Sequence, residues 1–397
     1  MRIESRHDLG HLSYCTNIHA GESWADVRTS LATHLPAIKA ASAPDRPFGI
    51  GLRLAARAVD SLRDPATLED FQDFLASGDY YVFTINGFPY GAFHGQTVKE
   101  NVYAPDWSKP ERLAYTNALA DLLATLLPHG QFGSISTVPG TFKPWVDGRT
   151  ELIADQLLDH VAHLVDLERR TGRTIALALE PEPCCMLETI AETAAFFNDQ
   201  LFSKRAVDRL AEISGLARGD AEQALRRHVG VCYDVCHAAV EYEDPAASIA
   251  ALRAAGISIP KLQLSSALRI ADVTGRTADD LRPFDEPVYL HQVIERRGDQ
   301  LHRFADLPEA LSRGSASIGS EWRVHFHVPV FLDQLKDFGT TQFFLREILA
   351  LHAADPISPH LEVETYTWDV LPDDYRNVAI STAIARELDW VTGQLLT

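Results

Sequence analysis

Leu177-Ala178-Leu179-Glu180-Pro181-Glu182-Pro183 is the segment that decides the fold of this 397-residue chain. Its apolar beginning predicts the end of a buried strand, and the two prolines that follow predict a loop. The segment therefore places two carboxylates, Glu180 and Glu182, where a strand meets a loop. Barrels of parallel strands build their active sites at such places.

The rest of the chain repeats the same plan, with apolar strand-like segments alternating with longer amphipathic ones. This alternation indicates βα units around a parallel sheet. The predicted strands are Leu12–Ile18, Phe48–Leu54, Tyr80–Asn86, Phe132–Val138, Thr174–Glu180, Val229–Asp234, Ile259–Ser265 and His360–Thr365. The predicted helices include Glu22–Ala41, Pro110–Leu127, Arg149–Thr171, Arg205–His228 and Asp373–Leu396. Eight such units favour a (β/α)₈ barrel, and an open doubly wound sheet is the alternative.

The spacing becomes irregular between the seventh and eighth strands. Three segments there look like additional strands, namely Val288–Arg296, Gln300–Leu307 and Trp322–Val330. We expect one barrel domain over residues 1–397 with a β-rich insertion at 285–330. An insertion at this position would lie over the active site as a lid or wall.

Composition narrows the range of functions. Hydrophobic residues make up 46% of the chain and charged residues 23%, which allows a sizeable core. The net charge of −19 and the absence of a basic run argue against binding of nucleic acid, whose phosphates need positive charge to neutralise them. No apolar run approaches the roughly 18 residues of a membrane span, and the charged N-terminus does not resemble a signal peptide. We therefore expect a cytoplasmic protein without membrane insertion, whose five cysteines are buried free thiols. No Gly-x-Gly-x-x-Gly follows a strand, which argues against a dinucleotide cofactor.

Polar side chains occur where the last four predicted strands end. They are Glu180, then Asp234 with His237, then Gln263, and finally Glu362 with Glu364, which alternation places on one face of their strand. Carboxylates that converge at a narrow barrel mouth repel one another and resist burial unless a divalent cation neutralises them. We expect the ligands Glu180, Asp234, Gln263 and Glu364, because Glu364 lies nearer the strand end than Glu362. This oxygen-rich set favours Mn²⁺, Mg²⁺ or Co²⁺ over Zn²⁺.

Each of these residues also has a structural interpretation. Glu180 could cap the following helix, Asp234 and His237 could form a hydrogen-bonded pair, and Gln263 could satisfy a core polar group.

Further polar residues are expected to contact a substrate. In the first half of the chain these are Asn17, His19, Arg53, Asn86 and His94, at or just beyond strand ends. Arg53 could bind a phosphate or carboxylate of a ligand, or pair with a carboxylate of the site. In the insertion, His325 and His327 would share a face if their segment is a strand, and one of them could reach the metal.

Several motifs resemble the xylose-isomerase-like superfamily of sugar isomerases and epimerases. Leu179-Glu180-Pro181-Glu182-Pro183 resembles the Glu-Pro-Lys-Pro signature of xylose isomerases, Asp234-Val235-Cys236-His237 resembles their (Asp/Glu)-x-x-His, and Glu364-Thr365-Tyr366 resembles the last metal ligand of ketose 3-epimerases. More narrowly, the chain is similar to the bacterial EboE family, called metabolite traffic proteins. The segments that carry this second resemblance are Tyr14–His19, Phe83–Tyr90, Ser134–Pro139 and His325–Phe331.

The resemblance implies a metal-dependent isomerase or epimerase for a polyhydroxylated, sugar-like or cyclitol-like metabolite, with other proteins of the same pathway as partners. Glu180, Glu364 or Glu182 would be the base, and His237 would position a hydroxyl or carry a proton. The chain departs from the pattern at Glu182, where xylose isomerases have lysine, and at Gln263, where epimerases have a metal-binding histidine. A non-catalytic binder or carrier and a metal-dependent phosphodiesterase of the endonuclease IV kind are the alternatives.

Overall fold

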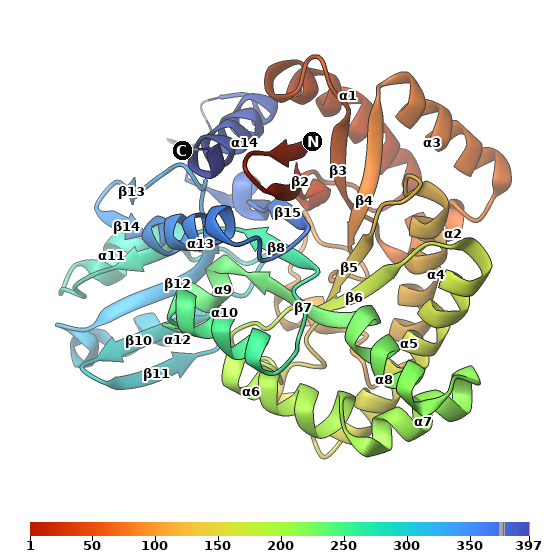
Figure 1. The fold of residues 1–397 in the computed structure, drawn as a ribbon. Helices are drawn as coiled ribbons and strands as arrows, with labels where there is room; N and C mark the ends of the chain where they lie inside the picture. The colour runs from red at the N-terminus through yellow and green to blue at the C-terminus, as the bar shows by residue number, and fades with distance from the viewer. Residues whose placement is uncertain (373–375, 377, 397) are drawn as a thin grey trace.

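Eight parallel strands form a nearly closed barrel in this computed structural model, which describes residues 1–372, 376 and 378–396 (Figure 1). The strands are β2 (Asp8–Tyr14), β3 (Phe48–Arg53), β4 (Tyr80–Asn86), β5 (Gly133–Thr137), β6 (Ile175–Leu179), β7 (Val229–Asp234), β8 (Lys261–Leu264) and β15 (His360–Val363). Their order is β2-β15-β8-β7-β6-β5-β4-β3, and a parallel bridge between Cys15 and Gly51 joins the two ends. The barrel prediction is therefore confirmed over the open sheet. A short strand β1 (Arg2–Glu4) pairs antiparallel with β2.

Strands β3, β6 and β7 are buried along their whole length, as parallel strands covered by helices are. Close packing inside the barrel explains why residue 51 is glycine. A Cβ on Gly51 would lie 1.8 Å from Glu362 Oε2. Glycine at position 51 therefore leaves room for the buried Glu362 carboxylate of β15.

Helices cover the outside of the barrel (Figure 1). In chain order they are α1 (Trp24–Ser42), α2 (Ala56–Ser61), α3 (Pro65–Ser77), α4 (Pro110–Leu126), α5 (Thr150–Thr171), α6 (Ile190–Phe196), α7 (Lys204–Ser214), α8 (Arg218–His228), α9 (Val235–Val240), α10 (Pro245–Ala254), α13 (Gln342–Ala354) and α14 (Ile380–Leu396). A capping box between Ser23 and Asp26 begins α1, and Asp244 caps α10 just before Pro245. These side chains satisfy backbone N–H groups of the first helical turn, which have no partner within the helix.

Some predicted boundaries were wrong. The first strand begins and ends four residues earlier than predicted, because β2 pairs with β15 only as far as Tyr14, and Thr16–Ile18 form the 3₁₀ turn η1. The predicted helix Arg205–His228 is two helices, because Gly215 adopts a left-handed conformation (φ 71°) that ends α7. The last strand ends at Val363 rather than Thr365. The last described helix begins at Ile380, and residues 373–375 and 377 of the predicted one lie outside the described residues.

A separate antiparallel sheet lies beside the barrel, between β8 and β15 in the chain (Figure 1). Its strands are β9 (Ala267–Ile270), β10 (Val293–Arg297), β11 (Gln300–Phe304), β12 (Glu321–His327), β13 (Gln334–Leu335) and β14 (Phe338–Thr340), in the order β11-β10-β12-β9-β14-β13. Two short helices, α11 (Thr277–Leu281) and α12 (Leu307–Leu311), belong to the same region. The sheet reaches beyond the expected insertion at 285–330 on both sides, because β9 pairs with both β12 and β14. Short strands of this kind give weak sequence signals.

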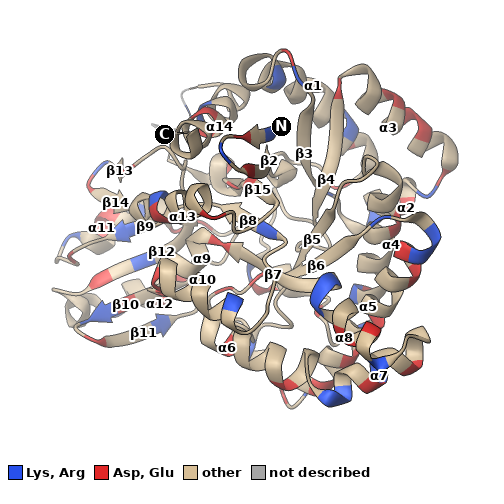
Figure 2. Cartoon of the chain, viewed as in Figure 1, with Lys and Arg blue, Asp and Glu red and all other residues tan. Residues whose placement is uncertain are grey.

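Charged side chains of both signs are interspersed over the outer helices and the added sheet (Figure 2). Among the described residues, no helix has both the length and the apolar character needed to cross a bilayer.

Candidate active site

Three carboxylates meet at the C-terminal end of the barrel. Glu180 directly follows β6, Asp234 is the last residue of β7, and Glu364 directly follows β15. One carboxylate oxygen of each lies within 4.8 Å of the others. All three side chains are buried, with residue exposures of 3%, 2% and 4%. The parallel arrangement explains the convergence, since every strand presents its C-terminal end at the same edge.

Hydrogen bonds from the protein hold one oxygen of Asp234 and one of Glu364. Asp234 Oδ1 accepts hydrogen bonds from the His237 amide (3.0 Å) and from Ser265 Oγ (2.7 Å), while Glu364 Oε1 accepts from Asn17 Nδ2 (2.6 Å) and Asn86 Nδ2 (3.1 Å). By contrast, Glu180 Oε2 and Asp234 Oδ2 are buried without a hydrogen-bond partner. Orphaned buried carboxylate oxygens are costly, and a bound cation would satisfy them. The three residues therefore fit a divalent cation.

Burial and mutual repulsion perturb the acidity of this cluster. Burial raises the pKa of Glu180 well above its usual value, and the nearby Glu364 and Asp234 charges add to the rise. Burial likewise raises the pKa of Glu364 to about 8, with the Asp234 and Glu362 charges next in size. Such shifts are typical of functional sites, because they arise where carboxylates are forced together away from water.

Gln263 and Glu362, the other two strand-end residues, have different surroundings. Gln263 is buried on β8 in register with Asp234 and Glu362, and its side chain lowers the pKa of Glu364. Its role as a ligand stays a prediction. Glu362 lies deeper and forms a salt bridge with Lys261, with 2.6 Å between Oε1 and Nζ and both side chains fully buried. Lys261 was not among the predicted site residues, although a lysine in the buried strand Lys261–Leu264 is an unusual residue that a sequence can reveal.

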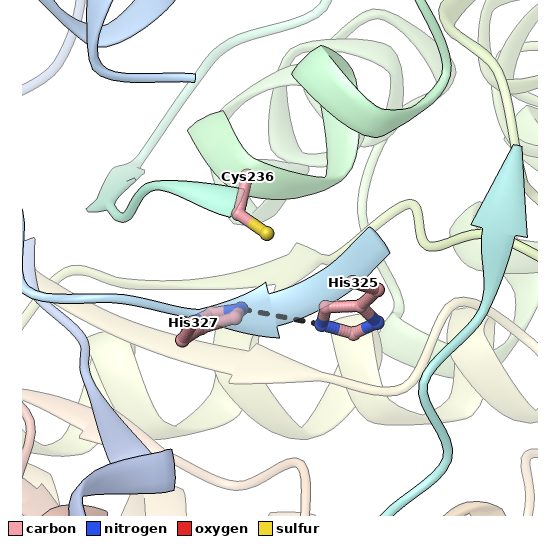
Figure 3. Close-up of side chains that lie close together, drawn as sticks. All are labelled: Cys236, His325 and His327. Carbon is pink, nitrogen blue, oxygen red and sulfur yellow. Dashed lines mark hydrogen bonds between the residues drawn. The ribbon is translucent and has the colours of Figure 1, made fainter. Parts of the chain in front are cut away.

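Three histidines lie beside the carboxylates. His237 belongs to the first turn of α9, and His325 and His327 lie two residues apart on β12. His325 Nε2 is 3.1 Å from His237 Nε2 and 3.2 Å from His327 Nε2. Figure 3 shows the Cys236 sulfur of α9 directed toward His325 and His327. Burial lowers the pKa of His325 well below its usual value and that of His327 to about 4. The added sheet thus brings its histidines to the barrel mouth.

A cavity of about 60 Å³ opens onto this region. Among the predicted site residues, it is lined by Asn17, Asn86, Glu180, Glu182, His237, His325 and Glu364. Its other walls are largely apolar and include Phe88, Phe93, Tyr103, Tyr289 and Tyr366. Tyr103 and Gln292 both donate to Glu182 Oε1, at 2.7 and 3.2 Å. Tyr103, Tyr289 and Gln292 were missed, because they reach the site from segments remote in sequence.

Four predicted substrate-binding residues lie away from the lining of this cavity. His19 stacks on His34, and its Nε2 lies 3.1 Å from Tyr14 Oη. Arg53 pairs with Glu22 at 3.2 Å and donates to the Gly21 carbonyl, so its guanidinium is engaged within the protein. His94 is partly exposed and packs edge-on against Phe93. His327 is not part of the cavity lining, although its Nε2 lies 3.2 Å from Nε2 of the lining residue His325.

No protein-family model matches the chain, and no curated protein matches it. Several solved structures are similar over almost the whole length. A xylose isomerase-like TIM barrel protein from Mycobacterium smegmatis in complex with magnesium has 12% identity and a TM-score of 0.49, and the match covers 97% of this chain and 96% of that one.

Two further structures are comparable. The probable 3-DHS dehydratase AsbF of Bacillus anthracis, which is involved in petrobactin synthesis, has 13% identity and a TM-score of 0.46, covering 96% of this chain and 98% of its own. The IolI protein with a bound zinc atom has 13% identity and a TM-score of 0.44, covering 97% and 98%. Similarity at this level transfers no function, and the fold described above rests on the strand order itself.

Proposed function

We propose that this protein is a metal-dependent isomerase or epimerase acting on a polyhydroxylated, sugar-like or cyclitol-like small molecule. The observation that carries the proposal is the convergence of Glu180, Asp234 and Glu364 at the barrel mouth, beside a cavity, with two buried oxygens left unpartnered. The resemblance of the same residues to isomerase and epimerase motifs supports it.

Glu180, Asp234 and Glu364 would hold the cation, and Gln263 would complete the set from the neighbouring strand. Their oxygen ligands favour Mn²⁺, Mg²⁺ or Co²⁺. When bound, the cation would hold adjacent substrate oxygens and stabilise the negative charge that develops as a proton is removed. The substrate would therefore need vicinal oxygens, as sugars and cyclitols have.

The base would be one of Glu180, Glu364 and Glu182, all of which line the cavity. Glu182 is held by Tyr103 and Gln292, and burial raises its pKa toward the range useful for proton transfer. His237 donates from Nδ1 to the Pro181 carbonyl (2.9 Å), which leaves Nε2 as an acceptor for a substrate hydroxyl. The ring contacts of Phe93, Tyr289 and Tyr366 would exclude water above the site.

Glu182 also argues against one reaction. A lysine at this position would place a protonated amine near the substrate carbonyl, whereas Glu182 supplies a hydrogen-bonded carboxyl group. We therefore favour proton removal and return at one carbon, as in epimerisation, over the aldose–ketose route that uses the lysine.

The test combines metal content with proton exchange. Metal-free protein would be reconstituted with Mn²⁺, Mg²⁺ or Co²⁺ and incubated in D₂O with panels of ketoses, aldoses and inosose-type cyclitols, and NMR would detect deuterium incorporation. We expect bound metal and exchange in the wild type, and loss of both in Glu180→Gln and Asp234→Asn. Glu387→Gln is the matched control, because Glu387 is a buried carboxyl outside the cluster. Wild-type protein that cannot be reconstituted would refute the proposal, and ligand binding without exchange would favour a carrier.

A further inference from the structure

The cavity beside the carboxylates has a polar floor and a largely apolar outer wall. Glu180, Glu182 and Glu364 are buried and form part of the floor. The outer wall includes Val102 and Leu290, which are partly exposed and therefore mark the opening to solvent. Aliphatic side chains of this kind offer neither hydrogen bonds nor an aromatic face. A substrate hydroxyl buried against them would lose its hydrogen bonds to water without replacement, which is costly.

The segment Gly87–Val98 supplies much of this wall, although it contains neither helix nor strand. Phe88 and Phe93 are among its side chains that line the cavity. The fully buried Arg112 of α4 holds the start of the segment, because its Nη1 donates to the carbonyls of Gly87 (2.7 Å) and Phe88 (3.0 Å). A buried guanidinium bound to backbone carbonyls fixes the course of the main chain there.

Further contacts hold the rest of the same segment. Glu22 Oε1 accepts a hydrogen bond from the Phe93 amide at 2.7 Å, and Arg53 holds the Glu22 carboxylate at 3.2 Å. At the end of the segment, the Val98 amide donates to the Val288 carbonyl at 2.8 Å. The wall is thus held in shape from outside the cavity. An apolar group of a ligand would find it already formed, and preorganisation of this kind favours binding.

The lining offers no free positive charge to an anionic substrate. Lys99 is the one lysine or arginine among the described residues that line the cavity. Its ammonium lies 2.7 Å from Asp306 Oδ2 and donates to the Glu286 carbonyl at 3.3 Å, so it is already engaged. A divalent cation would not outweigh the three carboxylates that hold it once all three are ionised. The site would therefore repel a phosphate or carboxylate group.

We propose that the substrate is an uncharged polyol or keto-polyol that carries an apolar substituent, namely an aryl or short alkyl group. Its vicinal oxygens would face the carboxylate floor. Its substituent would lie on Val98, Val102 and Leu290 and leave through the opening. This inference names the substrate class of the proposed isomerase or epimerase and so rests on that proposed function. It excludes sugar phosphates and sugar acids as substrates.

The test compares matched ligands by isothermal titration calorimetry of protein loaded with Mn²⁺. Glucose, galactose, mannose and myo-inositol would each be offered as the parent polyol, as its phenyl glycoside or phenyl ether, and as its phosphate ester. We expect the phenyl derivative to bind at least about tenfold more tightly than its parent in one or more series, because the apolar wall removes the ring from water. The phosphate esters should show no measurable binding.

Two wall variants identify the surface that is responsible. Val102→Asn and Leu290→Gln make the wall polar at partly exposed positions, and each should lose most of the preference for the phenyl derivative. Leu68→Gln is the matched control, because Leu68 is a partly buried leucine of α3 that does not line the cavity. It should keep the preference. Mn²⁺ binding should be unchanged in all three variants.

Three results would overturn the proposal. They are a phenyl derivative that binds no better than its parent in every series, tighter binding of a phosphate ester, and a phenyl preference that survives both wall variants. The outcome is separable from that of the proposed function, because the apolar wall needs no metal and metal-free wild type should keep the preference at lower affinity. A phenyl preference without Mn²⁺ binding would refute the metal-dependent reaction alone, whereas Mn²⁺ binding without a phenyl preference would refute only the substrate class.

Discussion

Replacement of Lys261 by methionine should strongly destabilise the protein. The Lys261 ammonium and the Glu362 carboxylate are 2.6 Å apart, and neither side chain is exposed. Methionine keeps much of the apolar stem but leaves the Glu362 charge without its partner inside the barrel. Loss of one member of a buried ion pair costs about 3–5 kcal/mol of unfolding free energy. The same change removes a positive charge that lowers the pKa values of Glu180 and Glu364, and so adds to the repulsion in the cluster.

The double variant Lys261→Met/Glu362→Met separates the charge effect from packing. With both charges replaced by apolar groups of similar volume, most of the loss should be recovered, because desolvating the pair also costs energy. We expect the double variant to lie within about 2 kcal/mol of the wild type, so that the two single changes are strongly non-additive.

Urea denaturation at pH 7 in the presence of a chelator would measure the unfolding free energy of the wild type, Lys261→Met, Glu362→Met and the double variant. The m-value serves as the control for a common unfolding transition. A loss below about 1 kcal/mol in Lys261→Met would refute the reasoning. Additive losses in the double variant would refute it equally, because they would mean that the two charges do not interact.

Three further outcomes follow from other buried groups. Glu364→Gln should raise the stability of metal-free protein at pH 7.5 by roughly 1–3 kcal/mol, because it removes a carboxyl whose ionisation is opposed by burial and then by the Asp234 and Glu362 charges. The same change should abolish stabilisation by added Mn²⁺; thermal denaturation with and without metal measures both effects, and an unchanged metal response would contradict the prediction. Gly51→Ala should cost more than about 2 kcal/mol in chemical denaturation, since its Cβ would lie 1.8 Å from the buried Glu362 Oε2 and 2.7 Å from the backbone carbonyl oxygen of Tyr14. An unchanged unfolding free energy would mean that these groups move aside at little cost. Burial raises the pKa of Glu387 from 4.5 to about 7, so the folded protein holds a proton there that the unfolded chain releases, and stability from this group falls as pH rises from about 4.5 through 7. Glu387→Gln should therefore gain stability relative to the wild type over that interval, and parallel pH profiles of the two proteins would count against it.

The sequence was most informative where a signal is local. The strands Tyr80–Asn86 and Val229–Asp234 were predicted to the residue, because apolar runs end there in polar side chains. The meeting of Glu180, Asp234 and Glu364 was also predictable, since parallel strands bring their C-terminal ends together.

Other features depend on contacts between distant segments. The pairing of Lys261 with Glu362 joins β8 to β15, and the approach of His325 to His237 joins the added sheet to α9. Arg53 forms a salt bridge with Glu22 and does not line the cavity. Residue type alone does not show which of these two positions an arginine takes. The extent of the added sheet was underestimated, because β9, β13 and β14 have only two to four residues each.

The central claim is that the barrel-mouth carboxylates bind a divalent cation. Titration of metal-free protein with Mn²⁺, followed by the electron paramagnetic resonance signal of the free ion, tests it most directly. We predict that the wild type removes Mn²⁺ from solution and that Glu180→Gln and Asp234→Asn do so far more weakly, while Glu387→Gln behaves as the wild type does. A free Mn²⁺ signal that is the same with wild type, with the cluster variants and with no protein would contradict the claim.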